Sequence, residues 1–175
     1  MYRSILLSAA ALALVVGTVS AEAACGVPVG VKVAQVQLPP LKFATTPSGD
    51  SIVGTWTTAL SINHQVILNT ILQWHSDGTE ADNADLPPTM GNTCEGSWVS
   101  TGPRKVHRFH LGWTFDANSN PNGMFILTED DRLATDGNSY RGTFDQMFYD
   151  SNGILVNEIS GTVTARRIGV QIAAQ

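Results

Sequence analysis

Hydrophobic and polar residues alternate with a period of two along most of the chain from residue 51 onward. The alternation is clearest in 104–115, 139–149 and 154–168, where apolar side chains recur at every second position. This pattern is typical of β-strands with one buried face, and no window of helical length shows a 3.6-residue repeat. The pattern therefore predicts an all-β domain.

Eight such runs are separated by turn-forming residues, so we expect eight strands. The expected strands are 52–60, 65–75, 79–84, 96–100, 104–115, 124–133, 139–149 and 154–168. Asp-Gly and Asn-Gly pairs lie between several of them, and these residues tolerate the positive φ that hairpin turns require. Closure into an eight-stranded antiparallel up-and-down barrel is favoured because it removes exposed strand edges; a two-sheet sandwich is the alternative.

The first 23 residues are typical of a secretory signal peptide. Arg3 precedes an apolar run at 5–19, and Ala21-Glu22-Ala23 has the small-x-small pattern of a cleavage site. The run is too short to predict a membrane span. We expect a signal peptide at 1–23, an N-terminal arm at 24–50, a barrel domain at 51–169 and a tail at 170–175, with the protein secreted or periplasmic.

The chain has two cysteines, Cys25 in the arm and Cys94 in the loop at 85–95. In an oxidising compartment only one pairing is possible, and it would tie the arm to the loop. Two free thiols are the alternative. No CxxC or HxxxH spacing accompanies the cysteines, so no metal site is predicted.

Composition narrows the function classes. Fifteen acidic residues against ten basic ones give a net charge of −5, which argues against a nucleic-acid partner. A hydrophobic fraction of 43% excludes long disorder. The sequence has no glycine-rich phosphate loop before a helix and no Gly-x-Ser-x-Gly motif, so no cofactor is predicted and an enzymatic role stays open.

Strand alternation assigns faces if the large apolar side chains point inward. In 104–115 this places His107, Phe109 and Trp113 inside, with Arg108, His110 and Thr114 outside. In 124–133 we expect the side of the strand that carries Phe125 to point inward, and this places Glu129 inside as well. The other expected interior residues are Leu111, Phe115, Tyr140, Phe144, Gln146, Phe148, Leu155, Asn157, Ile159, Val163 and Ala165. The acidic residues Asp77, Glu80, Asp82, Asp130 and Asp131 are expected at the solvated surface.

An aromatic interior with a few polar groups is the usual composition of a small-molecule site. We expect Trp113 and Phe144 to face each other across a hollow lumen that binds a small apolar or aromatic molecule. The alternative is that the polar groups only pair with one another or with water. The predicted ligand-binding residues are Trp56, Trp74, His75, His107, Phe109, Trp113, Phe144, Gln146 and Asn157.

Two short motifs carry a family resemblance. Gly54-Thr55-Trp56 in the first strand and Ala165-Arg166-Arg167 at the end of the last resemble the lipocalin signature, in which the Trp is covered by an Arg. The run 140–144 with Gly161-Thr162-Val163 is similar to calycin-like and allene-oxide-cyclase- or dirigent-type barrels. The stretches 74–80 and 91–94 are similar to a group of secreted bacterial proteins of unassigned function. The resemblance covers 52–168 in architecture and implies no catalytic residue.

Three functions follow as hypotheses. The first is a secreted barrel that binds a small molecule in its lumen. The second is a cofactor-free isomerase or cyclase of the allene-oxide-cyclase type, with His107 and Glu129 as its acid–base pair. The third is a structural or protein-interaction domain. The oligomeric state is left open.

Overall fold

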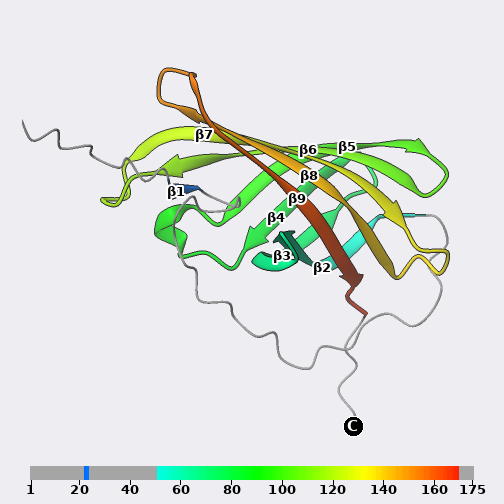
Figure 1. Cartoon of the computed structure of the whole chain (residues 1–175). Coiled ribbons are helices and arrows are strands. Elements are labelled where there is room, and N and C mark those ends of the chain that lie inside the picture. The colour runs from blue at the N-terminus through cyan, green and yellow to red at the C-terminus, as the bar shows by residue number, and fades with distance from the viewer. Residues whose placement is uncertain (1–21, 24–50, 170–175) are drawn as a thin grey trace, which may run out of the picture.

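The computed structural model describes residues 22–23 and 51–169, and these are arranged as an all-β fold (Figure 1). One helical turn, the 3-10 helix η1 (Pro88–Met90), lies between β4 and β5. The strands are β1 (Glu22–Ala23), β2 (Gly54–Ile62), β3 (Gln65–Trp74), β4 (Thr79–Ala84), β5 (Thr93–Gly102), β6 (Lys105–Phe115), β7 (Pro121–Leu133), β8 (Ser139–Asp150) and β9 (Leu155–Arg167).

Strands β2 to β9 form a closed antiparallel barrel. Each strand pairs with the next in sequence, and β9 returns to pair with β2 from Trp56↔Arg167 to Ser61↔Thr162. The up-and-down barrel predicted from the hairpin turns is therefore confirmed. Closure leaves each of the eight strands with a hydrogen-bonded neighbour on both sides, which removes the exposed edges of an open sheet.

The remaining predicted segments lie mostly outside the described residues. This holds for the arm at 24–50, the tail at 170–175 and all of the signal segment except β1, whose backbone pairs with Phe115 and Thr114 of β6. Cys94 is buried at the start of β5, but Cys25 lies outside the described part of the chain, so their pairing stays a prediction. Within the described ranges, no helix combines the length and apolar character needed to cross a membrane.

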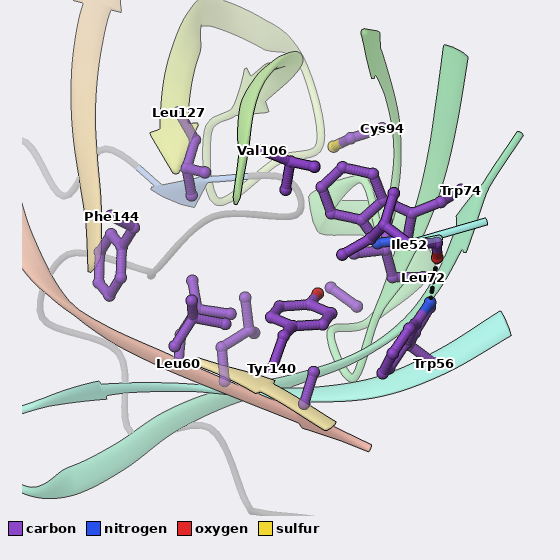
Figure 2. Close-up of a cluster of buried hydrophobic side chains, with 14 of the residues drawn as sticks. Ile52, Trp56, Leu60, Leu72, Trp74, Cys94, Val106, Leu127, Tyr140 and Phe144 are labelled. Atoms are coloured by element: carbon purple, nitrogen blue, oxygen red, sulfur yellow. Dashed lines mark hydrogen bonds between the residues drawn. The ribbon is translucent and has the colours of Figure 1, made fainter. Parts of the chain in front are cut away.

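Aromatic side chains fill both ends of the barrel interior. Trp56 and Tyr140 pack edge to face with ring centroids 4.9 Å apart, and Trp74 lies 6.0 Å from Tyr140 (Figure 2). At the other end, Phe125 lies 6.2 Å from Phe148. Aromatic pairs of this geometry add about 0.5–1.5 kcal/mol beyond the burial of their area.

Two glycines make room for the phenylalanine rings. A Cβ on Gly112 of β6 would lie 2.7 Å from the ring of Phe125, and a Cβ on Gly161 of β9 would lie 2.7 Å from the ring of Phe144. Because protein interiors are close-packed, each large ring needs a small residue opposite it. The absence of a side chain at Gly112 and Gly161 thus leaves the space that the rings of Phe125 and Phe144 occupy.

Arg167 closes one end of the barrel over Trp56. Its guanidinium carbon lies 4.1 Å from the centroid of the Trp56 ring, and it donates hydrogen bonds to the carbonyl oxygens of Ser51 (2.6 Å), Val53 (2.5 Å) and Gly137 (2.9 Å). The indole N–H of Trp56 donates to the carbonyl of Ile52 (Figure 2). This arrangement, together with the closed eight-stranded barrel, is compatible with a calycin-like fold.

Candidate functional site in the barrel lumen

Strand β6 presents its charged face to the lumen. Arg108, His110 and Thr114 are buried, whereas Phe109 is 38%, Leu111 41% and Trp113 64% exposed. The sequence-based assignment of this strand is therefore wrong, because it placed the aromatic face inside. The physical reason is that neighbouring strands direct carboxyl groups inward, and these neutralise the buried arginine.

Arg108 is the centre of a buried ionic cluster. Its guanidinium donates to Glu129 Oε1 of β7 at 2.9 Å, to Glu80 Oε2 of β4 at 3.1 Å and to Asp82 Oδ2 of β4 at 2.8 Å. All four side chains are at most 2% exposed. The ring centroid of Trp74 lies 5.9 Å from the guanidinium carbon. The arginine thus joins β4, β6 and β7 across the interior.

His110 completes the inner face of β6 as a neutral imidazole. Arg108 donates a hydrogen bond to its Nδ1, which therefore accepts, and the ring proton is assigned to Nε2. Burial and the nearby Arg108 charge hold the pKa of His110 well below its usual value. The ring packs against Phe125 at 5.6 Å between centroids. His110 thus adds no positive charge to balance the surrounding carboxyl groups.

Carboxyl groups outnumber positive charges in this cluster. Glu80, Asp82, Glu129 and Asp131 surround the single guanidinium of Arg108. Burial raises the pKa of Glu80 and of Glu129 in spite of the attraction to Arg108. Burial and the neighbouring Glu129 carboxylate raise the pKa of Asp131 to about 9. At neutral pH Asp131 is therefore a protonated acid.

Strand register and two glycines assemble the cluster. Arg108 is the Cα partner of Glu129, and Gly96 of β5 lies between Glu80 and His110 in adjacent registers. A Cβ on Gly96 would lie 2.4 Å from Glu80 Oε1, and a Cβ on Gly142 would lie 2.3 Å from Asp131 Oδ1. The carboxyl groups occupy the space that these glycines leave.

The expectation that the acidic residues are solvated is wrong for three of them. Glu80, Asp82 and Asp131 are buried, because the inner faces of β4 and β7 carry them in pairs two residues apart. Together with Arg108 and His110, they are the candidate site residues that the sequence interpretation missed. The available signal was the i, i+2 spacing of Glu80-x-Asp82 and Glu129-x-Asp131, opposite an equally spaced Arg108-x-His110.

Several buried polar atoms of the cluster have no hydrogen-bond partner among the described residues. They are Glu80 Oε1, Arg108 Nε and His110 Nε2, whereas the protonated Asp131 and the Glu129 carboxylate share a side-chain hydrogen bond. Buried polar groups in folded proteins are nearly always paired, and leaving one unsatisfied costs about 1–3 kcal/mol. These donors and acceptors are gathered at one place in the packed barrel interior, and neither of the two hollows described below is lined by them.

Four of the predicted ligand-binding residues do lie in the lumen. Trp56, Trp74, Phe144 and Gln146 are each at most 1% exposed, and Phe144 is the Cα partner of Glu129. Asn157 is half-buried near the start of β9.

Alternation also predicted which side chains of β8 and β9 point inward. On β8 the inward face of Tyr140, Phe144, Gln146 and Phe148 is confirmed. On β9 the inward assignment is confirmed for Val163 and Ala165, whereas Leu155 is 48% exposed and its assignment is wrong.

The other predicted site residues lie outside the lumen. His107 is 42% exposed, and its Nδ1 lies 2.9 Å from Asp130 Oδ1 on the outer face. The proposed acid–base pair of His107 with Glu129 is therefore not formed, because the two side chains lie on opposite faces of the sheet. Trp113 does not face Phe144 for the same reason. Phe109 is also exposed.

His75, another predicted ligand-binding residue, is exposed directly after β3. Its Nδ1 lies 3.1 Å from Thr79 Oγ1, and its carbonyl accepts a hydrogen bond from the Trp98 indole. Beside it, a shallow hollow of about 400 Å³ borders Trp74, whose indole contacts the ionic cluster. The hollow is lined by Val53, Gly54, Thr55, Gln73, Trp74, His75 and Ser76.

Within the described ranges, no three His, Cys, Asp or Glu side chains are arranged to hold a metal ion. The acidic cluster is organised around a guanidinium instead.

Comparison with known proteins gave no match: no family model, no curated protein and no solved structure is significantly similar to this chain. The class that fold and site define is an eight-stranded antiparallel barrel with a charged lumen.

Proposed function

We propose that the protein is a small-molecule-binding barrel whose lumen holds an apolar or aromatic ligand with an amine head group. The observation that carries this proposal is the set of unpartnered buried polar atoms around Arg108. Groups with shifted pKa values that gather at one place are typical of functional sites rather than of ordinary cores. Hydrogen bonds to a ligand would offset the cost of burying these atoms.

The charge balance of the cluster specifies the head group. Four carboxyl groups face one guanidinium, so the lumen favours a guest that is positively charged and donates hydrogen bonds. An ammonium group can donate to Glu129 Oε2 and Glu80 Oε1, and its charge favours release of the proton from Asp131. Trp56, Trp74 and Phe144 supply apolar surface for the body of the ligand.

Export to the periplasm or the extracellular space is part of the same proposal. It is supported by the signal-peptide pattern of Arg3, the apolar run at 5–19 and Ala21-Glu22-Ala23. The predicted bond between Cys25 and Cys94 fits that compartment, because disulfides persist in oxidising environments. N-terminal sequencing of the protein recovered from culture medium and periplasm tests the export.

Calorimetric titration with three compounds that share one body tests the binding. We expect 2-phenylethylamine to bind at least about tenfold more tightly than 2-phenylethanol and ethylbenzene, because only the amine is charged. Titration in two buffers of different ionisation enthalpy should also show proton release from Asp131. Glu129→Gln should weaken amine binding about tenfold or more, and Asp130→Asn is the matched control on the outer face.

Asp131→Asn provides a second variant that leaves the partners of Arg108 in place. It should abolish the proton release while the fold is retained, as followed by circular dichroism. Equal affinities for the three compounds, or weakening by Asp130→Asn as large as by Glu129→Gln, would contradict the proposal. Failure of all three compounds to bind at millimolar concentration would contradict it as well.

One observation favours the alternative role as a protein-interaction domain. Phe109, Leu111 and Trp113 form an exposed apolar stripe on the outer face of β6, and Val99 of β5 is also exposed. Exposed apolar surface of this kind is common at interaction sites. Light scattering of the wild type and Trp113→Ser tests this role: a larger mass that the variant loses supports it, and a monomeric wild type counts against it.

A further inference from the structure

A second hollow lies on the outer face of the barrel and is lined by arginines. It has a volume of about 810 Å³ and extends over β2, β7, β8 and β9. Its described lining includes four guanidinium groups but no Asp or Glu side chain. Thr57, Thr135, Ser139, Thr164 and Asn69 add polar groups to it, beside Arg104, Arg132, Arg141 and Arg166. The hollow is thus basic in a chain whose net charge is −5.

Strand register places two of these arginines side by side. Arg132 of β7 and Arg141 of β8 are Cα partners, and both are exposed on the outer face. Side chains directly opposite on adjacent strands have Cβ atoms about 4.5–5.5 Å apart, and like charges there are destabilising. Within 22–23 and 51–169, neither guanidinium has a hydrogen bond or an ion pair.

Two carboxylates on the strands around the hollow have other hydrogen-bond partners. Asp130, two residues before Arg132, contacts the His107 ring at 2.9 Å. Asp85 accepts hydrogen bonds from the backbone and side-chain amides of Asn69, at 3.0 and 2.9 Å. Both acids keep their negative charge, but their described hydrogen bonds go to His107 and Asn69 and not to Arg132 or Arg141, whose guanidinium groups can therefore bind an anion.

We propose that this hollow is a binding site for a small molecule that carries tetrahedral oxyanion groups, such as phosphate or sulfate. Arginine presents a planar fork of N–H donors that matches such groups, and it remains charged at every physiological pH. The hydroxyl groups of Thr164 and Ser139 can add neutral donors beside them. The site is independent of the lumen, because its arginines lie on the outer face of the sheet.

The pairing of the arginines across β7 and β8 favours a ligand with more than one anionic group. Adjacent strands are about 4.8 Å apart, so two linked oxyanions can each contact one guanidinium. Pyrophosphate should therefore bind more tightly than inorganic phosphate. Because the site is exposed, binding should weaken as ionic strength rises.

Calorimetric titration of the full chain at low ionic strength tests the proposal. The probes are inorganic phosphate, pyrophosphate and a disulfated disaccharide, with the unsulfated disaccharide as the neutral control. We expect pyrophosphate or the sulfated sugar to bind, and whichever binds more tightly identifies the source of the oxyanion. Arg132→Gln and Arg141→Gln should each weaken that binding at least about tenfold.

Lys105→Gln is the matched control. It removes the same charge from the position opposite Arg132 on β6, but Lys105 does not line the hollow. It should weaken binding less than about threefold, as expected for a neighbouring charge that does not contact the ligand. Absence of binding by both anionic probes would overturn the proposal. Equal loss of anion affinity in all three variants would also overturn the proposal. Binding would then depend on the net charge of the protein and not on a specific site.

Discussion

Arg108 and Arg141 show two opposite environments for the same side chain. Arg108 lies in the lumen, 1% exposed, and its guanidinium donates hydrogen bonds to three carboxyl groups. Arg141 lies on the outer face beside Arg132, with no carboxylate lining the hollow around it. The cluster in the lumen is thus acidic overall, whereas the lining of the outer hollow is basic. Inside, low polarity demands partners for every charge; outside, water tolerates like charges until an anion binds.

Removing the inner arginine should have the largest effect. Arg108→Met leaves Glu80, Asp82 and Glu129 without their shared partner, and breaking a buried ion pair in this way costs about 3–5 kcal/mol. Urea unfolding followed by tryptophan fluorescence measures the change. Arg141→Met should alter the free energy of unfolding by less than about 0.5 kcal/mol, since it is exposed. Similar losses in both variants would show that the two environments do not differ as described.

Arg167 tests a third environment, in which a guanidinium is held by carbonyl groups and an aromatic ring. Arg167→Ala removes hydrogen bonds to Ser51, Val53 and Gly137 and the contact with Trp56. We expect a loss of about 2–3 kcal/mol in the free energy of unfolding. Thermal unfolding provides the measurement. Arg167→Lys should recover less than half of the loss, and full recovery would show that charge alone suffices there.

The excess of carboxyl groups in the lumen should make stability fall as pH rises. The pKa of Asp131 is about 9 in the folded chain and near 3.8 when unfolded, so the folded state holds a proton that the unfolded state has lost between these values. Its stabilising contribution is complete below the unfolded pKa and is lost as pH rises through the folded one.

Asp131→Asn removes this dependence. The variant should match the wild type near pH 4 and exceed it by at least about 1 kcal/mol at pH 8, because one pKa unit corresponds to about 1.4 kcal/mol. Urea unfolding across this pH range is the measurement, with Asp130→Asn on the outer face as the control. A constant difference between variant and wild type at all pH values would argue against a protonated Asp131.

The sequence predicted the barrel but not the contents of its lumen. Hairpin turns and two-residue alternation define strand order locally, and on β8 the apolar residues Tyr140, Phe144 and Phe148 share one face. On β6 each face has a reason to be buried: one carries Phe109 and Trp113, the other Arg108 beside small residues. The choice depends on Glu129, which lies 21 residues away and becomes the partner of Arg108 only through the register of β6 and β7.

The basic hollow was hidden from sequence interpretation for a similar reason. Arg104, Arg132, Arg141 and Arg166 are spread over four segments of an acidic chain, and no local run of positive charge identifies them. Only the pairing of β6 with β7, of β7 with β8 and of β8 with β9 brings them together. Long-range register, unlike alternation, cannot be derived from neighbouring residues.

The most direct test of the charged lumen is a carbon-13 NMR titration of the carboxyl carbons between pH 3 and 10. One aspartate resonance should titrate near pH 9 and disappear in Asp131→Asn, because a buried acid beside the carboxylate of Glu129 retains its proton through neutrality. Titration of every aspartate below about pH 5 would contradict the account, since Asp131 would then be ionised and solvated rather than enclosed with Arg108.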